Sequence, residues 1–243
     1  MSRLSDLVMF YEMLEALEQR CGGKRLLRDC DGRQNWPQRG VYFFFERGEK
    51  RTQTGAGARV VRVGTHALKD GSRTTLWNRL SQHQGVRRTG SGNHRGSIFR
   101  LLAGQALIAR DGLDVPTWGV GGDAGKAAAR LGLDREEVKS MEQPIEKVVS
   151  ETLGTMELLW IPIEDAPGPG SLRGYIERNA IALLSNYRGN AIDPPSSNWL
   201  GRFSNREKVR QSGLWNSNHV DEDYEPAFLR ALDRVVGASK PFG

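Results

Sequence analysis

The first twenty residues alternate apolar and polar positions in the manner of an amphipathic helix. Apolar side chains recur every three or four positions between Leu4 and Leu17, which is the spacing of one helical face. Gly22 and Gly23 follow and are expected to end the helix. The pattern therefore predicts a helix over residues 2–20.

Three later apolar runs have the composition of β-strands. Residues 40–46 and 59–64 are rich in aromatic and β-branched side chains, as strands are. A polar, glycine-containing segment joins these two runs, so we expect them to pair antiparallel. Residues 157–163 form a third apolar run and are interpreted as a third strand.

Most of the remaining apolar periodicity is helical. Helices are expected over 74–84, 97–110, 124–131, from 134 onward, over 171–186 and over 225–236. The predicted fold class is α/β (α+β), with a small three-stranded antiparallel sheet flanked by helices. We interpret 1–37 as an N-terminal helical extension and 38–193 as a core with a helical insertion at about 111–155. Residues 194–243 are interpreted as a C-terminal extension.

Positive charge is concentrated in one part of the chain. The formal net charge is +6, yet residues 47–110 contain thirteen Lys or Arg against only Glu49 and Asp70. Such a concentration attracts a polyanion. A basic, solvated surface without a partner is the alternative, and charge alone does not separate DNA from RNA.

Several classes of protein are disfavoured by composition. No apolar run of about 18 residues is present to span a membrane, and the N-terminus lacks the pattern of a signal peptide. Cys21 and Cys30 are too few for a disulfide framework or a zinc site, so we expect a cytoplasmic protein. The segment from Val120 to Ala127 resembles a phosphate loop but lacks its first glycine and final hydroxyl. No nucleotide cofactor is therefore expected.

The candidate chemistry lies in short motifs that occur in a fixed order. Gly40-Val41-Tyr42 opens the first predicted strand, and Arg62-Val63-Gly64 ends the second. Arg79 and His83 lie one turn apart on the next helix. Glu177 lies on the late helix, with Asn190 thirteen residues further on.

These motifs, and the order strand, strand, helix, helix, strand, helix, resemble the GIY-YIG nucleases. The resemblance covers about half of the chain. It implies that Tyr42 is the catalytic tyrosine, that Arg79 and His83 are catalytic, and that Glu177 binds the metal. Arg62 departs from the pattern, because it occupies the position of the tyrosine in the second motif.

The residue types suit phosphodiester hydrolysis. A planar arginine such as Arg79 can grip phosphate oxygens. A lone carboxylate such as Glu177 can hold one hydrated Mg²⁺, with Mn²⁺ as an alternative, whereas a metal pair needs a cluster of acids. Tyr42 would act as the general base, with its pKa lowered by adjacent cations such as Arg62 or by metal-bound water.

Further residues are candidates for contact with nucleic acid. They are chosen for their position near the motifs or for their positive charge, and they are His66, Arg87, Arg88, His94, Arg95 and Asn190. Trp118, Trp199 and Trp215 are candidates for target contacts or a dimer surface, with structural anchoring as the alternative.

The sequence thus predicts a Mg²⁺-dependent DNA endonuclease with double-stranded DNA as its substrate and no membrane partner. The chain resembles stand-alone members of the family, such as the restriction type, and a homodimer remains open. A non-catalytic nucleic-acid-binding module on the same scaffold is the main alternative, since it accommodates Arg62 without turnover. A nuclease acting on RNA or branched DNA is a third possibility.

Overall fold

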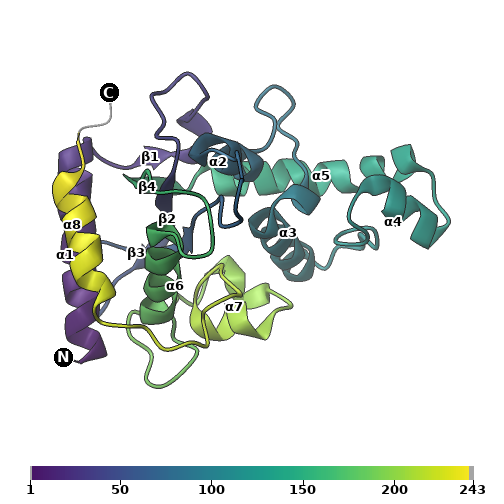
Figure 1. Ribbon diagram of the computed structural model, residues 1–243. Coiled ribbons are helices and arrows are strands. Elements are labelled where there is room, and N and C mark those ends of the chain that lie inside the picture. The colour runs from purple at the N-terminus through teal and green to yellow at the C-terminus, as the bar shows by residue number, and fades with distance from the viewer. Residues whose placement is uncertain (1, 241–243) are drawn as a thin grey trace.

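A four-stranded antiparallel sheet lies between two layers of helices in the computed structural model, which describes residues 2–240 (Figure 1). The strands are β1 (Arg25–Leu26), β2 (Gly40–Lys50), β3 (Ala58–Gly64) and β4 (Glu157–Pro162), in the spatial order β1-β4-β2-β3. The prediction of three strands was wrong by one. The additional strand, β1, has only two residues and pairs with the start of β4, so it leaves no periodic pattern in the sequence.

The helices follow the sequence expectations closely. They are α1 (Arg3–Cys21), α2 (Leu76–Gln84), α3 (Ile98–Asp111), α4 (Ala124–Leu131), α5 (Arg135–Gly154), α6 (Leu172–Leu184), α7 (Glu207–Ser212) and α8 (Phe228–Ala238). Three short 3₁₀ turns are η1 (Leu27–Asp29), η2 (His94–Gly96) and η3 (Leu200–Phe203). Gly22 ends α1 in the left-handed conformation, and Ser171 caps α6, as the sequence predicts. Helix α7 was not predicted.

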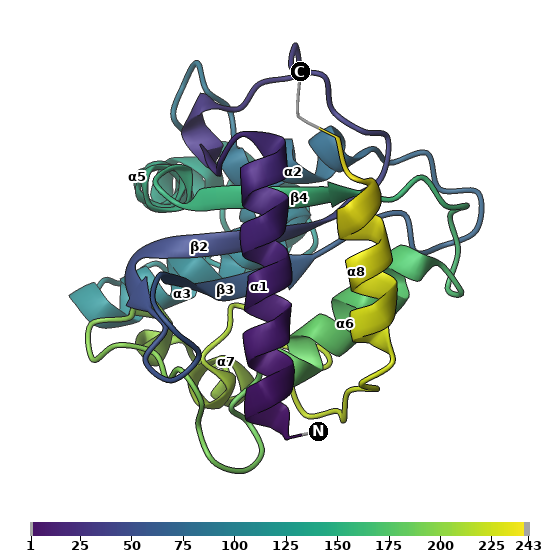
Figure 2. The same cartoon turned by 90° about the vertical axis from the view of Figure 1, so that its left-hand side faces the viewer.

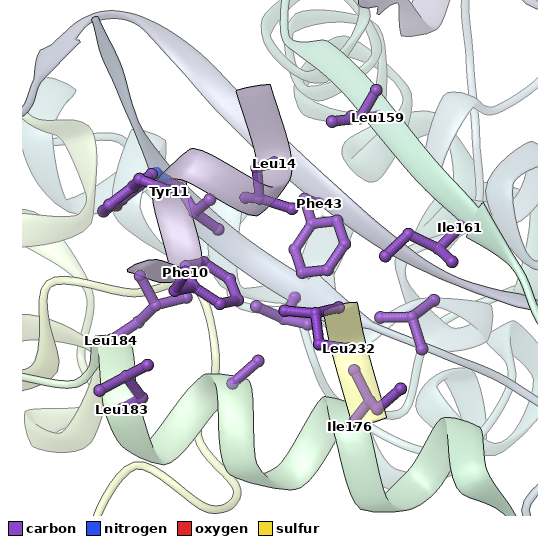
Figure 3. Packing of buried hydrophobic residues seen from close by; sticks show 14 of the residues in the cluster. Phe10, Tyr11, Leu14, Phe43, Leu159, Ile161, Ile176, Leu183, Leu184 and Leu232 are labelled. Carbon is purple, nitrogen blue, oxygen red and sulfur yellow. The ribbon is translucent and has the colours of Figure 1, made fainter. Parts of the chain in front are cut away.

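One face of the sheet is covered by α1, α6 and α8 (Figure 2). Figure 3 shows the core between them, where the rings of Phe10 and Phe43 meet edge to face with centroids 5.9 Å apart. Ile176 and Leu183 reach this core from α6. Packing of this face positions α6, the helix that carries Glu177.

The opposite face of the sheet packs against α2, α3 and α5. Successive residues of β2 alternate between the two cores, with Phe43 in the first and Tyr42 and Phe44 in the second. Phe44 meets Phe99 of α3 at a centroid distance of 5.4 Å. Because β2 is buried on both faces, its sequence is a continuous apolar run instead of an alternating one.

The C-terminal extension closes the free edge of β3. The backbone N–H of Trp215 donates to the carbonyl of Val61 over 2.7 Å. The Asn216 side chain accepts from the N–H of Val63 at 3.1 Å and donates to its carbonyl at 2.8 Å. These bonds satisfy backbone groups that an open edge strand would expose.

The three tryptophans considered as target contacts are buried anchors. Trp199 and Trp215 both donate their indole N–H to the Glu46 carboxylate, at 3.0 and 3.2 Å. The Trp118 ring stacks on His94 with centroids 3.9 Å apart. Their exposed fractions are 8% or less, so they hold the extension and the insertion on the core.

Candidate active site

Tyr42 lies near the start of β2 and faces the second core. Its side chain is fully buried, and its hydroxyl lies 2.8 Å from Nε2 of His83. The ring covers Gly64, its neighbour on β3, so closely that a Cβ there would lie 2.3 Å from the Tyr42 oxygen. The glycine of the second motif is therefore required by the position of the tyrosine of the first.

His83 connects Tyr42 to the beginning of α3. Its Nδ1 lies 2.7 Å from the hydroxyl of Ser97, which caps α3 by accepting the N–H of Arg100. Burial lowers the pKa of His83 well below its usual value, and the charges of Arg79 and Arg62 lower it further. The imidazole is therefore neutral at physiological pH, with one nitrogen donating and the other accepting.

Arg62 faces the same layer as Tyr42 because it pairs in register with Phe44, and a bulge in β3 lies next to this pair. Phe44 pairs with Arg62, but the next residue, Phe45, pairs with Val60. Val61 is thus the extra residue, and both it and Arg62 face the second core. Bulges next to active sites commonly redirect a side chain in this way.

The Arg62 guanidinium is buried among defined partners. It donates to the Trp215 carbonyl and lies 4.8 Å from the centroid of the Phe99 ring. Burial lowers the pKa of Arg62, while the charges of Tyr42 and Glu177 raise it. The structure therefore places the buried Arg62 side chain beside the tyrosine and the glutamate.

Glu177 meets the sheet where β3 ends. Its Oε1 accepts the backbone N–H of Thr65 at 3.0 Å, while Oε2 has no hydrogen-bond partner within residues 2–240. Burial raises the pKa of Glu177, and the charge of Arg62 and the Thr65 hydrogen bond lower it in part. Glu177 thus binds the residue that directly follows Gly64.

Arg79 lies on the accessible side of this constellation. It is half-buried on α2 and donates to Gln82 of the same helix over 3.0 Å. It lines an open hollow of about 590 Å³ together with Gln82 and the residues from Thr65 to Ser72, which include Lys69 and Asp70. A cationic hollow of this kind can receive a phosphodiester.

The predicted nucleic-acid contacts divide into buried and exposed groups. His66 is 6% exposed and donates from Nε2 to the Gln38 carbonyl at 3.2 Å, and burial lowers its pKa to about 4. His94 is buried, with Nδ1 2.9 Å from Glu146 and Nε2 accepting the N–H of Gly119. Neither ring is presented on the surface of this structure.

Three arginines and one asparagine complete the predicted set. Arg95 forms a paired ion contact with Glu142 at 2.6 and 2.7 Å. Arg87 and Arg88 are exposed on the loop after α2. Asn190 is exposed beyond the C-terminal end of α6, where its carbonyl accepts from Arg3. The structure therefore does not bring Asn190 together with Glu177.

The basic surface is smaller than the distribution of Lys and Arg along the sequence predicts. Several cations of the 47–110 segment are neutralised by acids that are mostly distant in sequence. The pairs are Arg51–Glu15, Arg59–Glu49, Arg95–Glu142 and Arg100–Glu146. The positive surface is accordingly confined to exposed residues such as Lys69, Arg73 and Arg88.

Four further residues that the motifs did not include contribute to the site. Ser97 orients His83, and Thr65 binds Glu177 through its backbone. The Asn216 side chain binds Val63 near the end of β3, and His219 contributes a charge that lowers the pKa of Glu177. Only Ser97 could have been noticed, because a serine before an apolar helix is a typical N-cap.

The described part of the chain offers few ligands to a metal. Within residues 2–240 no group of three or more His, Cys, Asp or Glu is positioned to hold an ion. A lone carboxylate with one unpartnered oxygen, as in Glu177, fits a hydrated Mg²⁺, which keeps several waters.

Within residues 2–240 no helix is long and apolar enough to cross a membrane.

The model of the GIY-YIG domain family matches residues 1–241, including both flanks and the insertion. The chain therefore belongs to the GIY-YIG domain family, whose members are typically nucleases that act on DNA. Comparisons with curated proteins and with solved structures gave no significant match.

Proposed function

We propose that the protein is a Mg²⁺-dependent DNA endonuclease in which Tyr42 is the general base and Glu177 the metal ligand. The observation that supports this most is the convergence of both residues on two successive positions, the last residue of β3 and the one that follows it. Tyr42 covers Gly64, and Glu177 accepts the N–H of Thr65. The base and the metal ligand thus both contact this strand end, where Thr65 lines the hollow together with Arg79.

The partners of the Ser97 hydroxyl define which atom donates in each hydrogen bond of the series Ser97–His83–Tyr42. The Ser97 oxygen accepts the N–H of Arg100, and the only other contact of its hydroxyl within residues 2–240 is His83 Nδ1. The Ser97 proton is therefore donated to Nδ1, which leaves the His83 proton on Nε2. Nε2 then donates to the Tyr42 oxygen and stabilises the phenolate that a general base requires.

The surrounding cations help to keep His83 neutral. Arg62 and Arg79 both lower the pKa of His83, so the imidazole does not take up a second proton. Arg62 also interacts with the charge of Tyr42. As the phenolate, Tyr42 would accept the proton of the attacking water, while Arg79 and Lys69, which line the hollow, would hold the oxygens of the phosphate.

A Mg²⁺ or Mn²⁺ ion held by Glu177 would stabilise negative charge on the leaving oxygen. Glu177 must be ionised to hold it, and the Thr65 N–H together with Arg62 favours that form.

One observation favours a second function, a non-catalytic DNA-binding module. Arg62 occupies the position of the second-motif tyrosine and is buried against the Trp215 carbonyl. A permanent charge there replaces a neutral hydroxyl beside the catalytic groups, and such a change is compatible with lost turnover.

Cleavage of DNA distinguishes the two functions. Supercoiled plasmid and a phage genome are incubated with the protein and Mg²⁺, with EDTA as a control. We expect cleavage that EDTA, Tyr42→Phe and Glu177→Ala each abolish, while DNA binding is retained. Discrete fragments would indicate sequence specificity, as in restriction-type members.

Matched variants outside the site guard against general damage to the fold. Tyr187→Phe and Glu12→Ala remove the same groups from a half-buried and an exposed position and should cleave like the parent. Unaltered DNA of both forms with the parent protein would favour the binding module, and full activity of Tyr42→Phe would refute the assigned base.

A further inference from the structure

The segment between α2 and η2 forms a projecting loop with a defined shape (Figure 1). Over residues 85–92, Val86 donates its N–H to the Ser91 carbonyl at 2.7 Å, and Gly90 turns the chain with a φ of 65°. Val86 is 54% exposed and the Arg87 side chain 53%. The tip thus presents an apolar side chain and two arginines to solvent on a closed turn.

The base of this loop is held by a buried cation. The Arg100 side chain is fully buried and donates to Glu146, to Ser150 and, at 2.9 Å, to the carbonyl of His83. Glu146 and Ser150 lie on α5, in the predicted insertion. One guanidinium therefore connects the insertion to the helix that carries His83.

Two glycines allow the loop to close over that cation. A Cβ at Gly92 would lie 2.1 Å from Nη2 of Arg100, and one at Gly85 would lie 2.5 Å from the Ser91 carbonyl oxygen. The two ends of the loop therefore approach each other and the guanidinium as closely as backbone can. Such a loop loses little conformational entropy when it binds.

We propose that the 85–92 loop is a preformed element that enters a groove of double-stranded DNA beside the cleavage site and reads its sequence. The proposal rests on the proposed function. Arginine is the side chain that most often contacts guanine edges, and an apolar side chain such as Val86 suits the thymine methyl group. Arg88 has no acidic partner within residues 2–240, and Arg87 has only Asp31, at 3.5 Å on the surface.

The position of the loop relative to the site sets what it can read. Gln84 lies five positions after Arg79 on α2, a rise of roughly 8 Å. Because base pairs of DNA are about 3.4 Å apart along the axis, this rise spans about two base pairs, and the loop would begin close to the phosphate that Arg79 holds. Base preferences that depend on the loop should therefore lie within a few base pairs of the cut.

Binding of DNA by a non-cleaving form tests the proposal independently of catalysis. The full chain with Glu177→Ala is titrated against a randomised 30-base-pair duplex, with and without Arg87→Ala and Arg88→Ala together. The matched control carries Arg230→Ala and Arg234→Ala, two exposed arginines of α8 on the opposite face of the sheet. We expect the loop pair to weaken binding about tenfold or more and the α8 pair to change it less than twofold.

Selection of bound sequences from the same duplex supplies the second readout. The loop pair should lose base preferences that the α8 pair retains. Equal binding and equal preferences of the two pairs would overturn the proposal, as would a parent protein that binds no duplex. Loop-dependent binding by a parent protein that shows no Mg²⁺-dependent cleavage would instead refute only the proposed function.

Discussion

The Tyr42 hydroxyl lies 2.8 Å from Nε2 of His83, in a fully buried contact. If Nε2 donates to the tyrosine oxygen, His83→Ala removes the donor and should reduce the cleavage rate about 100-fold, a typical loss for one positioned proton-transfer partner. His83→Gln keeps an N–H donor on a side chain of similar reach and should retain more activity. Single-turnover cleavage rates compare the two variants.

If the two substitutions acted only by destabilising the fold, the cleavage rate of His83→Gln would not exceed that of His83→Ala. Thermal unfolding of both variants serves as the control, because each opens a space in the second core. Equal rates for His83→Ala and His83→Gln, at equal stability, would contradict the assigned direction of the hydrogen bond.

A second prediction concerns the pH dependence of cleavage. Burial raises the pKa of Glu177, and Arg62 opposes that rise. Because a metal binds the ionised carboxylate, activity should fall with decreasing pH at a pH above the usual glutamate range. Arg62→Met removes the opposing charge, so the pKa of Glu177 rises further and the acid limb of the pH–rate profile moves to higher pH.

Arg62→Lys keeps a positive charge and should leave the acid limb close to that of the parent. Rates measured under subsaturating DNA from about pH 5 to about pH 8, a range that begins above the usual glutamate pKa, give the two profiles. An acid limb that is identical in the parent and in Arg62→Met would show that Arg62 does not act on Glu177.

The local elements could be predicted from the sequence because their signals are local. The apolar spacing from Leu4 to Leu17 and the terminating Gly22 define α1, and Ser171 marks the start of α6. In contrast, β1 exists only through its pairing with β4, and the bulge at Val61 depends on the register of β3 against β2. Neither contact leaves a periodic trace.

The candidate site shows the same division. Tyr42, His83 and Glu177 were expected from motif order, and the structure gathers them around the end of β3. The buried environment of His94 was not expected, because its partner Glu146 lies 52 residues away on α5. The extent of the basic surface was not predicted for a related reason, because most of the acids that neutralise its cations come from distant segments.

A third prediction tests the contact between the two motifs. Gly64→Ala places a Cβ 2.3 Å from the Tyr42 oxygen and 2.4 Å from its ring carbon. The buried ring has no room to move aside, so overpacking should destabilise the fold by about 1–3 kcal/mol and displace the tyrosine. Chemical denaturation measures the first effect, and cleavage assays measure the second.

Gly237→Ala provides the matched control. This glycine lies in α8, where an added Cβ would meet no atom within 4 Å, and alanine is the better helix former. The stability of this variant should be unchanged or higher. Gly64→Ala with the stability and activity of the parent would mean that Tyr42 is not held against β3 as described.

The last prediction concerns the ion cluster that joins the insertion to the catalytic helix. Burial alone would raise the pKa of Glu146, but the hydrogen bond from His94 and the charge of Arg100 bring it below its usual value. Glu146→Ala leaves the Arg100 guanidinium buried without its carboxylate, which costs about 3–5 kcal/mol. Since 1 kcal/mol corresponds to roughly 2–4 °C in a chain of this size, the melting temperature should fall by roughly 10 °C.

The sign of the pH dependence adds a check. A carboxyl group whose pKa is lowered by folding stabilises the protein fully above its unfolded pKa and loses that contribution as pH falls through its folded pKa. The difference in melting temperature between the parent and Glu146→Ala should therefore be largest near neutral pH and shrink toward acid pH. Glu136→Ala removes a carboxylate from the exposed Glu136–Lys139 pair of the same helix, where such pairs contribute little. A loss of stability as large for Glu136→Ala as for Glu146→Ala, or one independent of pH, would contradict a specific role for the buried cluster.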